Sequence, residues 1–200
     1  MNRIIKLLFL FSFTFLLAAC ERSPGPLPAG AVILAFGDSM TYGTGAGEGE
    51  SYPEVLERLI GRKVVNAGVP GEITAEGIER LPRVLAEVKP QLVILCHGSE
   101  DMLQGLEAAP LIANLRTMVE LSVASGAEVF IVAVPPPAPH FQPAAFYNQI
   151  ARDAKVPIEV YALSTILSRE AMRSDSYHPN ARGYAALAEA VAKRLETPQR

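Results

Sequence analysis

The chain alternates short apolar runs with longer amphipathic segments, and this alternation restricts its fold more than any other feature. The apolar runs are rich in β-branched residues and occupy 32–36, 64–65, 92–96, 129–134 and 158–161. The segments between them have a helical period and occupy 52–60, 75–88, 111–125, 144–154 and 181–195. Short strands separated by helices form βαβ units. The sequence therefore predicts an α/β fold: a three-layer α/β/α sandwich with a five-stranded parallel sheet covered on both faces.

Length and charge exclude several classes of protein. A chain of 200 residues is long enough for one domain with a sizeable core and too short for two. Half of the residues are hydrophobic and 20% are charged, which is typical of a globular protein. The formal net charge of −3 gives no indication of a nucleic-acid partner. Cys96 lies inside an apolar run and is expected to be buried. No pattern indicates an oligomeric state.

Residues 1–19 have the organisation of a lipoprotein signal peptide. Two basic residues precede an apolar run at 7–19, which is shorter than the ~20 residues of a membrane-spanning helix. The run leads into LAAC at 17–20, which resembles a bacterial lipobox and predicts lipidation of Cys20. An uncleaved anchor, or a plain signal peptide with a chance cysteine, are the alternatives.

The segment that follows predicts how the protein is attached. Residues 20–30 contain three Pro and two Gly and are expected to form a flexible tether, so that the folded domain occupies 31–197. With a lipidated Cys20, this arrangement predicts a lipid-anchored protein of the bacterial cell envelope on the periplasmic face, with the membrane as a partner. Glu21 after the cysteine favours the outer membrane where the source has two membranes.

Candidate site residues are expected where the strands end, because parallel sheets bind ligands beyond the carboxyl ends of their strands. Ser39 follows the first run within FGDSMTYG, and Gly68 follows the second. The polar cluster HGSED at 97–101 follows the third run, and the stiff loop PPPAPHF at 135–141 follows the fourth. Ser39 can act as a nucleophile there, and glycine lets a backbone N–H approach a ligand.

Asp175 and His178 form a second candidate element near the C-terminus. An Asp and a His three residues apart can meet in one turn, so that the carboxylate accepts from one ring nitrogen and leaves the other free as a base. Ser39 would supply the nucleophile that this pair lacks. Taken alone, the motif fits a helix start capped by Asn180 with an incidental histidine equally well.

Four blocks of the sequence, in order and spacing, resemble the SGNH or GDSL hydrolases. The blocks are Gly37-Asp38-Ser39, Asn66-Ala67-Gly68, Gly98-Ser99-Glu100-Asp101 and Asp175-x-x-His178-Pro179. Within that family the chain is most similar to the bacterial thioesterase, arylesterase and lysophospholipase branch. The similarity covers about residues 31–195.

The resemblance implies a flavodoxin-like sandwich and a serine esterase of acyl esters or thioesters, such as aryl esters or lysophospholipids. In that family's pattern Ser39 attacks the ester carbonyl, His178 transfers the proton and Asp175 orients the imidazole. The oxyanion is held by the backbone N–H groups of Ser39 and Gly68 and by an Asn side chain. No metal or cofactor is implied. Acetylated sugar esters are an alternative class of small substrate.

The third block departs from the family pattern, because Glu100 stands where the family has the oxyanion-hole Asn. An ionised Glu brings only acceptors. Three interpretations stay open: a protonated Glu100 donates its O–H, or Glu100 turns away and Ser99 or a water replaces it, or the enzyme is impaired. In the last case the chain would be a ligand- or envelope-binding lipoprotein that keeps the fold.

Four further residues are candidates for the substrate pocket. His97 and Ser99 border the third strand end. His140 and Phe141 lie on the loop after the fourth strand, which flanks the acyl pocket in the family that the chain resembles. An ordinary surface loop explains His140 and Phe141 equally well.

Overall fold

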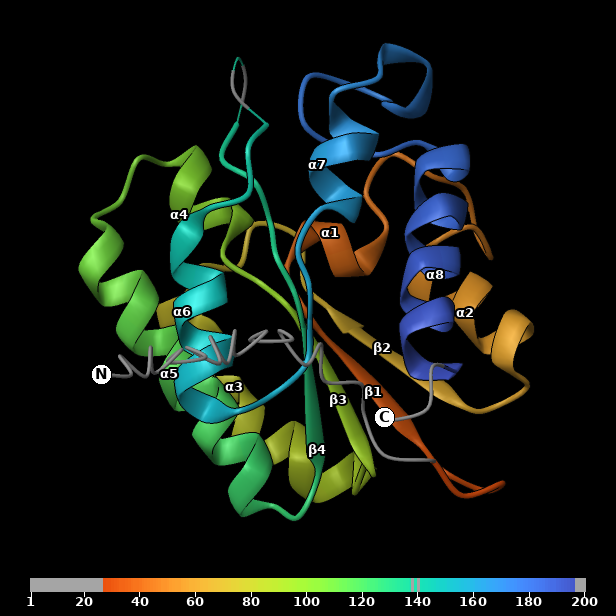
Figure 1. Ribbon diagram of the computed structural model, residues 1–200, viewed down its shortest axis with the longest axis vertical. Helices are drawn as coiled ribbons and strands as arrows, with labels where there is room; N and C mark the ends of the chain where they lie inside the picture. The colour runs from red at the N-terminus through yellow and green to blue at the C-terminus, as the bar shows by residue number, and fades with distance from the viewer. Residues whose placement is uncertain (1–26, 138, 140, 197–200) are drawn as a thin grey trace, which may run out of the picture.

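A five-stranded parallel sheet forms the centre of the molecule in the computed structural model, which describes residues 27–137, 139 and 141–196 (Figure 1). Its strands are β1 (Ile33–Gly37), β2 (Val64–Gly68), β3 (Leu92–Cys96), β4 (Glu128–Val132) and β5 (Ile158–Glu159). The strands lie side by side in the order β2-β1-β3-β4-β5. This order is that of flavodoxin-like sheets, in which β1 and β3 flank the point where the chain direction reverses. The predicted α/β sandwich is therefore confirmed.

Helices cover both faces of the sheet (Figure 1). The long helices are α2 (Tyr52–Ile60), α3 (Thr74–Val88), α5 (Ala108–Ala124), α6 (Ala145–Ala154) and α8 (Ala181–Glu196). The short ones are α1 (Ser39–Tyr42), α4 (Ser99–Leu103), α7 (Ala162–Leu167) and the 3-10 turn η1 (Glu170–Met172). On one face α5 packs between α3 and α6, and on the other α8 packs against α2 and α7. The predicted long helices agree with these bounds to within a few residues.

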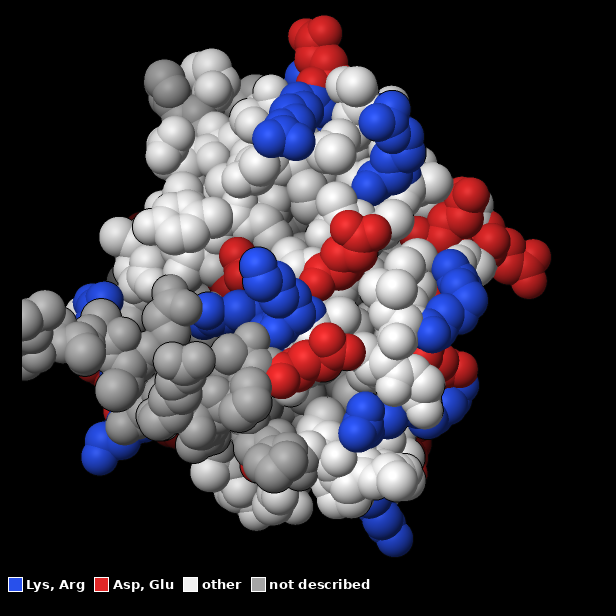
Figure 2. All heavy atoms as spheres, turned by 45° about the vertical axis from the view of Figure 1, so that its right-hand side comes forward, with Lys and Arg blue, Asp and Glu red and all other residues white. Residues whose placement is uncertain are grey.

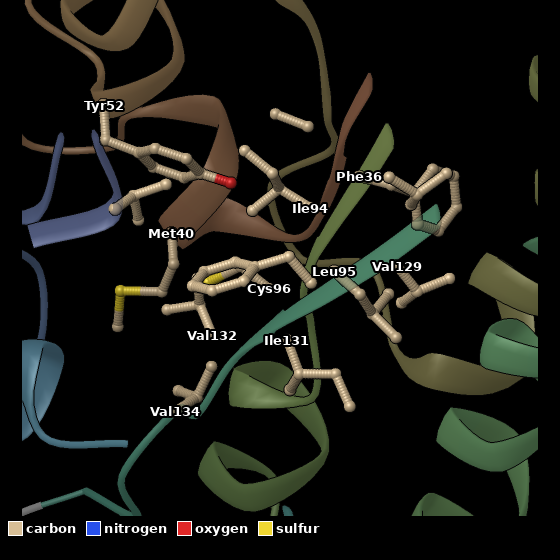
Figure 3. Packing of buried hydrophobic residues seen from close by; sticks show 14 of the residues in the cluster. Phe36, Met40, Tyr52, Ile94, Leu95, Cys96, Val129, Ile131, Val132 and Val134 are labelled. Atoms are coloured by element: carbon tan, nitrogen blue, oxygen red, sulfur yellow. The ribbon is translucent and has the colours of Figure 1, made fainter. Parts of the chain in front are cut away.

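The core lies between the sheet and its helices, and β1 and β3 are buried along their whole length. Figure 3 shows Phe36, Met40, Tyr52 and Cys96 among the buried side chains at this centre. Burying one large apolar side chain stabilises a fold by about 1.5–3 kcal/mol. Burial also raises the pKa of the Cys96 thiol, so this side chain is the buried hydrophobe that the sequence predicts.

The central strands end at the same level, which brings the segments that follow them together. Gly37 pairs with Gly68 on one side and with Cys96 on the other. A Cβ added at Gly37 would lie 1.8 Å from the carbonyl oxygen of Cys96 and 2.4 Å from Thr41 Oγ1. Only glycine fits at this close approach. Residues 38–39, 69–71 and 97–99 therefore begin side by side at the carboxyl edge of the sheet.

The described chain begins inside the predicted tether. The predicted signal peptide and Cys20 lie outside the described residues, and lipidation and envelope location stay predictions. The carbonyl oxygen of Leu27 accepts from Arg62 Nη2 at 3.1 Å, and that of Pro28 accepts from Arg62 Nε at 3.3 Å. The last residues of the predicted tether are therefore held against the domain.

The surface and the helices give two further observations. None of the helices within residues 27–196 has both the length and the apolar character needed to cross a bilayer. On the face in Figure 2, Lys and Arg side chains are interspersed with Asp and Glu, so this face has a mixed charge.

Candidate active site

Ser39 stands at the first position of α1, immediately beyond β1. The helix starts there because the Asp38 side chain caps it, with Oδ1 accepting from the Met40 N–H at 3.1 Å. At the other end, Gly43 stops the helix with a φ of 102°. The hydroxyl of Thr41 donates to the Cys96 carbonyl at 3.1 Å. The turn that carries Ser39 is therefore fastened to β3.

Asp175 and His178 share a compact turn before α8. The N–H groups of Tyr177 and His178 both donate to Asp175 Oδ1, each at 2.7 Å. The Ser174 N–H donates to the His178 carbonyl at 2.9 Å and closes the turn. Asn180 caps α8, as predicted, by accepting from the Gly183 N–H at 3.1 Å. The helix start and the Asp–His turn are thus neighbouring features of one segment.

The fold brings this turn to Ser39. His178 Nε2 lies 3.1 Å from Ser39 Oγ, and His178 Nδ1 lies 2.8 Å from Asp175 Oδ2. The carboxylate can only accept, so the Nδ1 proton points at Asp175 and Nε2 is free to take the Ser39 proton. This is the relation of nucleophile, base and orienting group that acyl transfer requires.

Asp175 is held as a carboxylate by this environment. Burial raises its pKa, but hydrogen bonds from the N–H groups of Tyr177 and His178 and from the His178 ring outweigh burial. The pKa of Asp175 is therefore below its ordinary value of 3.8. A carboxylate that stays ionised can stabilise an imidazolium at neutral pH.

The lowered pKa of Asp175 gives a stability prediction. A group whose pKa falls on folding stabilises the fold above its unfolded-state pKa, and this contribution is lost as pH falls through the folded-state pKa. The substitution Asp175→Asn removes this pH-dependent contribution to stability. We expect the wild type to exceed Asp175→Asn in free energy of unfolding at pH 7, with the difference shrinking as pH falls below 3.8. Urea unfolding at pH 7 and at pH 3 measures this, and a difference that grows in acid would contradict it.

Gly68 does not present the free N–H that its predicted oxyanion role requires. Its N–H donates to Asn66 Oδ1 at 2.9 Å, within its own turn. A Cβ added at Gly68 would lie 2.0 Å from the backbone nitrogen of Tyr42, so its glycine identity has a packing reason. The Ser39 N–H, by contrast, has no hydrogen bond among the described residues, because the cap at Asp38 is used by Met40.

Glu100 lies in α4 with its carboxylate directed along the helix. Its Oε1 accepts from the Gln104 side-chain amide at 2.9 Å, one turn further on. The neighbouring Ser99 is fully buried, and its Oγ has no hydrogen-bond partner among the described residues. Glu100 thus has a partner within its own helix, and its interpretation stays a prediction. The buried Ser99 hydroxyl cannot reach a substrate to replace an Asn donor.

His97 is the clearest correction among the predicted pocket residues. Its side chain has 0% exposure, and Nε2 lies 3.1 Å from Glu72 Oε2. The ring is directed toward α3, where a Cβ at Gly77 would lie 2.5 Å from Nε2. His97 therefore does not line a pocket open to substrate.

The other predicted pocket residues lie after β4. Phe141 lines a hollow of ≈ 430 Å³ beside α7, together with Tyr161 and Thr165. The guanidinium carbon of Arg173 lies 5.4 Å from the centroid of the Phe141 ring. His140 lies outside the described residues, so its prediction stays open.

Two residues of the site region were given no role by sequence reasoning. Tyr177 is buried between the two residues of the Asp–His turn, and its hydroxyl donates to the Pro135 carbonyl at 2.6 Å. This bond ties the turn to the start of the segment that follows β4. The Asn66 side chain accepts from Gly68 and donates to the Tyr42 carbonyl at 3.2 Å. Asn66 belongs to the second block of the resemblance, but its side-chain contacts depend on where Tyr42 lies.

This chain is similar to known proteins in both sequence and structure. The model of the GDSL-like lipase/acylhydrolase family matches residues 35–186. An arylesterase from Vibrio mimicus is 30% identical over 202 residues, covering 96% of this chain and 98% of that protein. The crystal structure of TesA superposes with a TM-score of 0.76 at 29% identity, covering 82% of this chain and 98% of that one.

A further solved structure agrees. AlinE4, an SGNH-hydrolase family esterase, superposes with a TM-score of 0.66 at 31% identity, covering 86% of this chain and 100% of that one. Sequence and structure comparisons thus point to the same group as the geometry at Ser39. The chain belongs to the GDSL-like lipase/acylhydrolase family of carboxylic ester hydrolases.

Proposed function

We propose that this protein is a serine esterase that hydrolyses acyl esters and thioesters by a Ser-His-Asp mechanism. The observation that carries the proposal is the chain of contacts from Ser39 Oγ to His178 Nε2, at 3.1 Å, and from His178 Nδ1 to Asp175 Oδ2, at 2.8 Å. The arylesterase and the esterase among its relatives support aryl esters and other carboxylic esters as substrates.

In the first half-reaction, Ser39 Oγ attacks the ester carbonyl carbon while His178 Nε2 takes its proton. The resulting imidazolium is stabilised by the ionised Asp175 and then protonates the leaving alcohol or thiol. The acyl group remains on Ser39. In the second half-reaction, His178 takes a proton from water, the hydroxide attacks the acyl carbon, and the acid leaves with Ser39 reprotonated.

The oxyanion that forms in each half-reaction needs hydrogen-bond donors. The Ser39 N–H is the donor that the structure leaves available beside the nucleophile, at the start of α1. Loss of one such donor typically lowers kcat by about 10²–10³-fold. We infer that the hydrogen bond from Gln104 to Glu100 keeps the carboxylate away from this oxyanion, because ionised Glu100 brings only acceptors. The proposed enzyme is therefore slower than one with a full set of donors.

The test of the proposed function is labelling of the nucleophile together with a substrate panel. A fluorophosphonate should label the wild-type protein at Ser39, because His178 activates this hydroxyl. The panel contains p-nitrophenyl esters of increasing chain length, an acyl thioester, a lysophospholipid and an acetylated sugar. We expect turnover of the aryl esters and the thioester. A folded wild-type protein that neither reacts with the probe nor hydrolyses any ester would refute the proposal and favour a binding role.

A further inference from the structure

A cluster of buried ionisable side chains lies beneath the candidate active site and takes no part in the proposed chemistry. Asp38 and His97 both have 0% exposure, and Glu72 has 6%. Arg80 joins them from α3. Buried charged groups are costly unless they are paired and hydrogen-bonded. The contacts of this cluster indicate what it holds in place.

One part of the cluster is a bidentate ion pair between Arg80 and Glu72. Arg80 Nε and Nη2 donate to the two carboxylate oxygens of Glu72, each at 2.6 Å. Arg80 Nη2 also donates to the carbonyl of Ala67 in β2, at 3.0 Å. The guanidinium carbon lies 4.2 Å from the centroid of the Phe36 ring in β1. This bidentate pair is therefore anchored to the two strands beside the candidate active site.

Glu72 decides which nitrogen of His97 carries the proton. Burial raises the pKa of Glu72, but hydrogen bonds from His97 and Arg80 and the positive charge of Arg80 outweigh burial and lower the pKa. The ionised carboxylate can only accept, so His97 Nε2 donates to Glu72 Oε2 at 3.1 Å. Nδ1 then presents a lone pair to a neighbouring donor.

That lone pair is used at the end of β3. The Gly98 N–H lies 2.9 Å from His97 Nδ1 and 2.9 Å from Asp38 Oδ2, so the two acceptors share it. Tyr147 Oη donates to the His97 carbonyl on the other side of the same peptide, at 2.7 Å. Gly98 itself has a φ of 105°, and a Cβ there would lie 2.9 Å from Tyr147 Oη. The peptide between His97 and Gly98 is therefore held on both its N–H and its carbonyl.

Asp38 connects this peptide to the nucleophile. Its Oδ2 also accepts from the Ser99 N–H at 2.8 Å, while its Oδ1 accepts from the Met40 N–H at 3.1 Å. One buried carboxylate thus links the first turn of α1, which carries Ser39, with the first turn of α4. A shift of the Gly98 peptide would move both donors at Oδ2 and, with them, the Asp38 side chain.

We propose that His97 is a positioning residue for ester hydrolysis, in which Nδ1 holds the Gly98 N–H and so keeps Asp38 and the Ser39 turn in the reactive geometry. Glu72 and Arg80 support it by keeping the proton on Nε2. This inference rests on the proposed esterase function. A displacement of about 1 Å from a change outside the chemistry can cost about 10²-fold in rate, which makes such positioning measurable in kcat.

Two matched variants separate the ring nitrogens of His97. In His97→Asn the new side-chain oxygen lies at the level of Nδ1 and keeps an acceptor for the Gly98 N–H. In His97→Gln the new amide nitrogen lies at the level of Nε2, so it keeps the donor to Glu72 and loses that acceptor. We expect kcat within about threefold of the wild type for His97→Asn and a loss of about 10- to 100-fold for His97→Gln, with KM within about twofold for both. Equal kcat values in the two variants, or losses that follow only the fall in Tm, would overturn the proposal.

A measurement on the wild-type protein keeps the test independent of variant folding and of activity. In protein labelled with ¹⁵N, the side-chain shifts of His97 should show a neutral ring protonated at Nε2, and the Gly98 amide should exchange slowly with solvent. A proton on Nδ1, or a rapidly exchanging Gly98 amide, would also overturn the proposal. If the wild type hydrolyses no ester while these signals are as expected, the proposed function fails and the hydrogen-bond arrangement stands.

Discussion

Ser39→Ala is expected to lower kcat for a short p-nitrophenyl ester by about 10⁴- to 10⁶-fold. The reason is geometric. Ser39 Oγ is the atom that lies 3.1 Å from His178 Nε2, so its removal leaves the base without a nucleophile to activate. Initial rates at saturating substrate, with the buffer rate subtracted, measure the effect.

The matched control for Ser39→Ala is Ser176→Ala. Ser176 is exposed and lies inside the Asp–His turn, where its carbonyl accepts from Arg173 Nη1 at 3.5 Å. Its hydroxyl is not part of the contacts between Ser39, His178 and Asp175. We expect unchanged kcat and KM for this variant. Equal rates for Ser39→Ala and the wild type would show that the hydrolysis does not pass through Ser39.

Glu100→Asn is expected to raise kcat by tens-fold or more. The change supplies an amide N–H₂ at the start of α4, and one oxyanion donor is typically worth about 10²–10³-fold in rate. It also removes a carboxylate, and two unit charges about 4 Å apart interact by about 4 kcal/mol at an effective dielectric of 20. In the wild type this repulsion is reduced because Gln104 holds Glu100 along the helix, at 2.9 Å. Steady-state kcat and KM on the aryl ester panel measure the gain.

Glu100→Gln separates the charge of Glu100 from the position of the donor. The glutamine side chain is nearly the same size as the wild-type glutamate and is neutral. Its amide lies one methylene further from the backbone than the amide that Glu100→Asn introduces. A gain in Glu100→Asn alone means that the donor must lie close to α4. A fall in kcat in both variants would contradict the view that the Glu100 carboxylate slows the reaction. It would indicate that Glu100 takes part as a protonated donor.

Local sequence patterns were sufficient for the layers of the fold. The run Leu92–Cys96 is entirely apolar, and the structure buries it as β3 with the same bounds. Ser51 and Glu54, three residues apart at the start of α2, form a capping box in which the Ser51 N–H and hydroxyl both donate to Glu54 Oε2. Helices α1 and α4 were missed because four or five residues are too few to show a helical period. Their starts depend on Asp38, whose carboxylate caps α1 and also accepts the N–H groups of Gly98 and Ser99.

At the candidate site the sequence by itself determined which chemistry is available, and the tertiary structure decided where each group points. Ser39 could be chosen from its place after the first strand, because strand ends meet at one edge of a parallel sheet. The spacing of Asp175 and His178 alone left their role open, and the resemblance to the SGNH hydrolases assigned it. The direction of the His97 ring toward Glu72, the use of the Gly68 N–H by Asn66 and the bond from Gln104 to Glu100 could not. Each depends on which partner lies within about 3 Å, and such a distance is set by the packing of segments rather than by the local pattern of the chain.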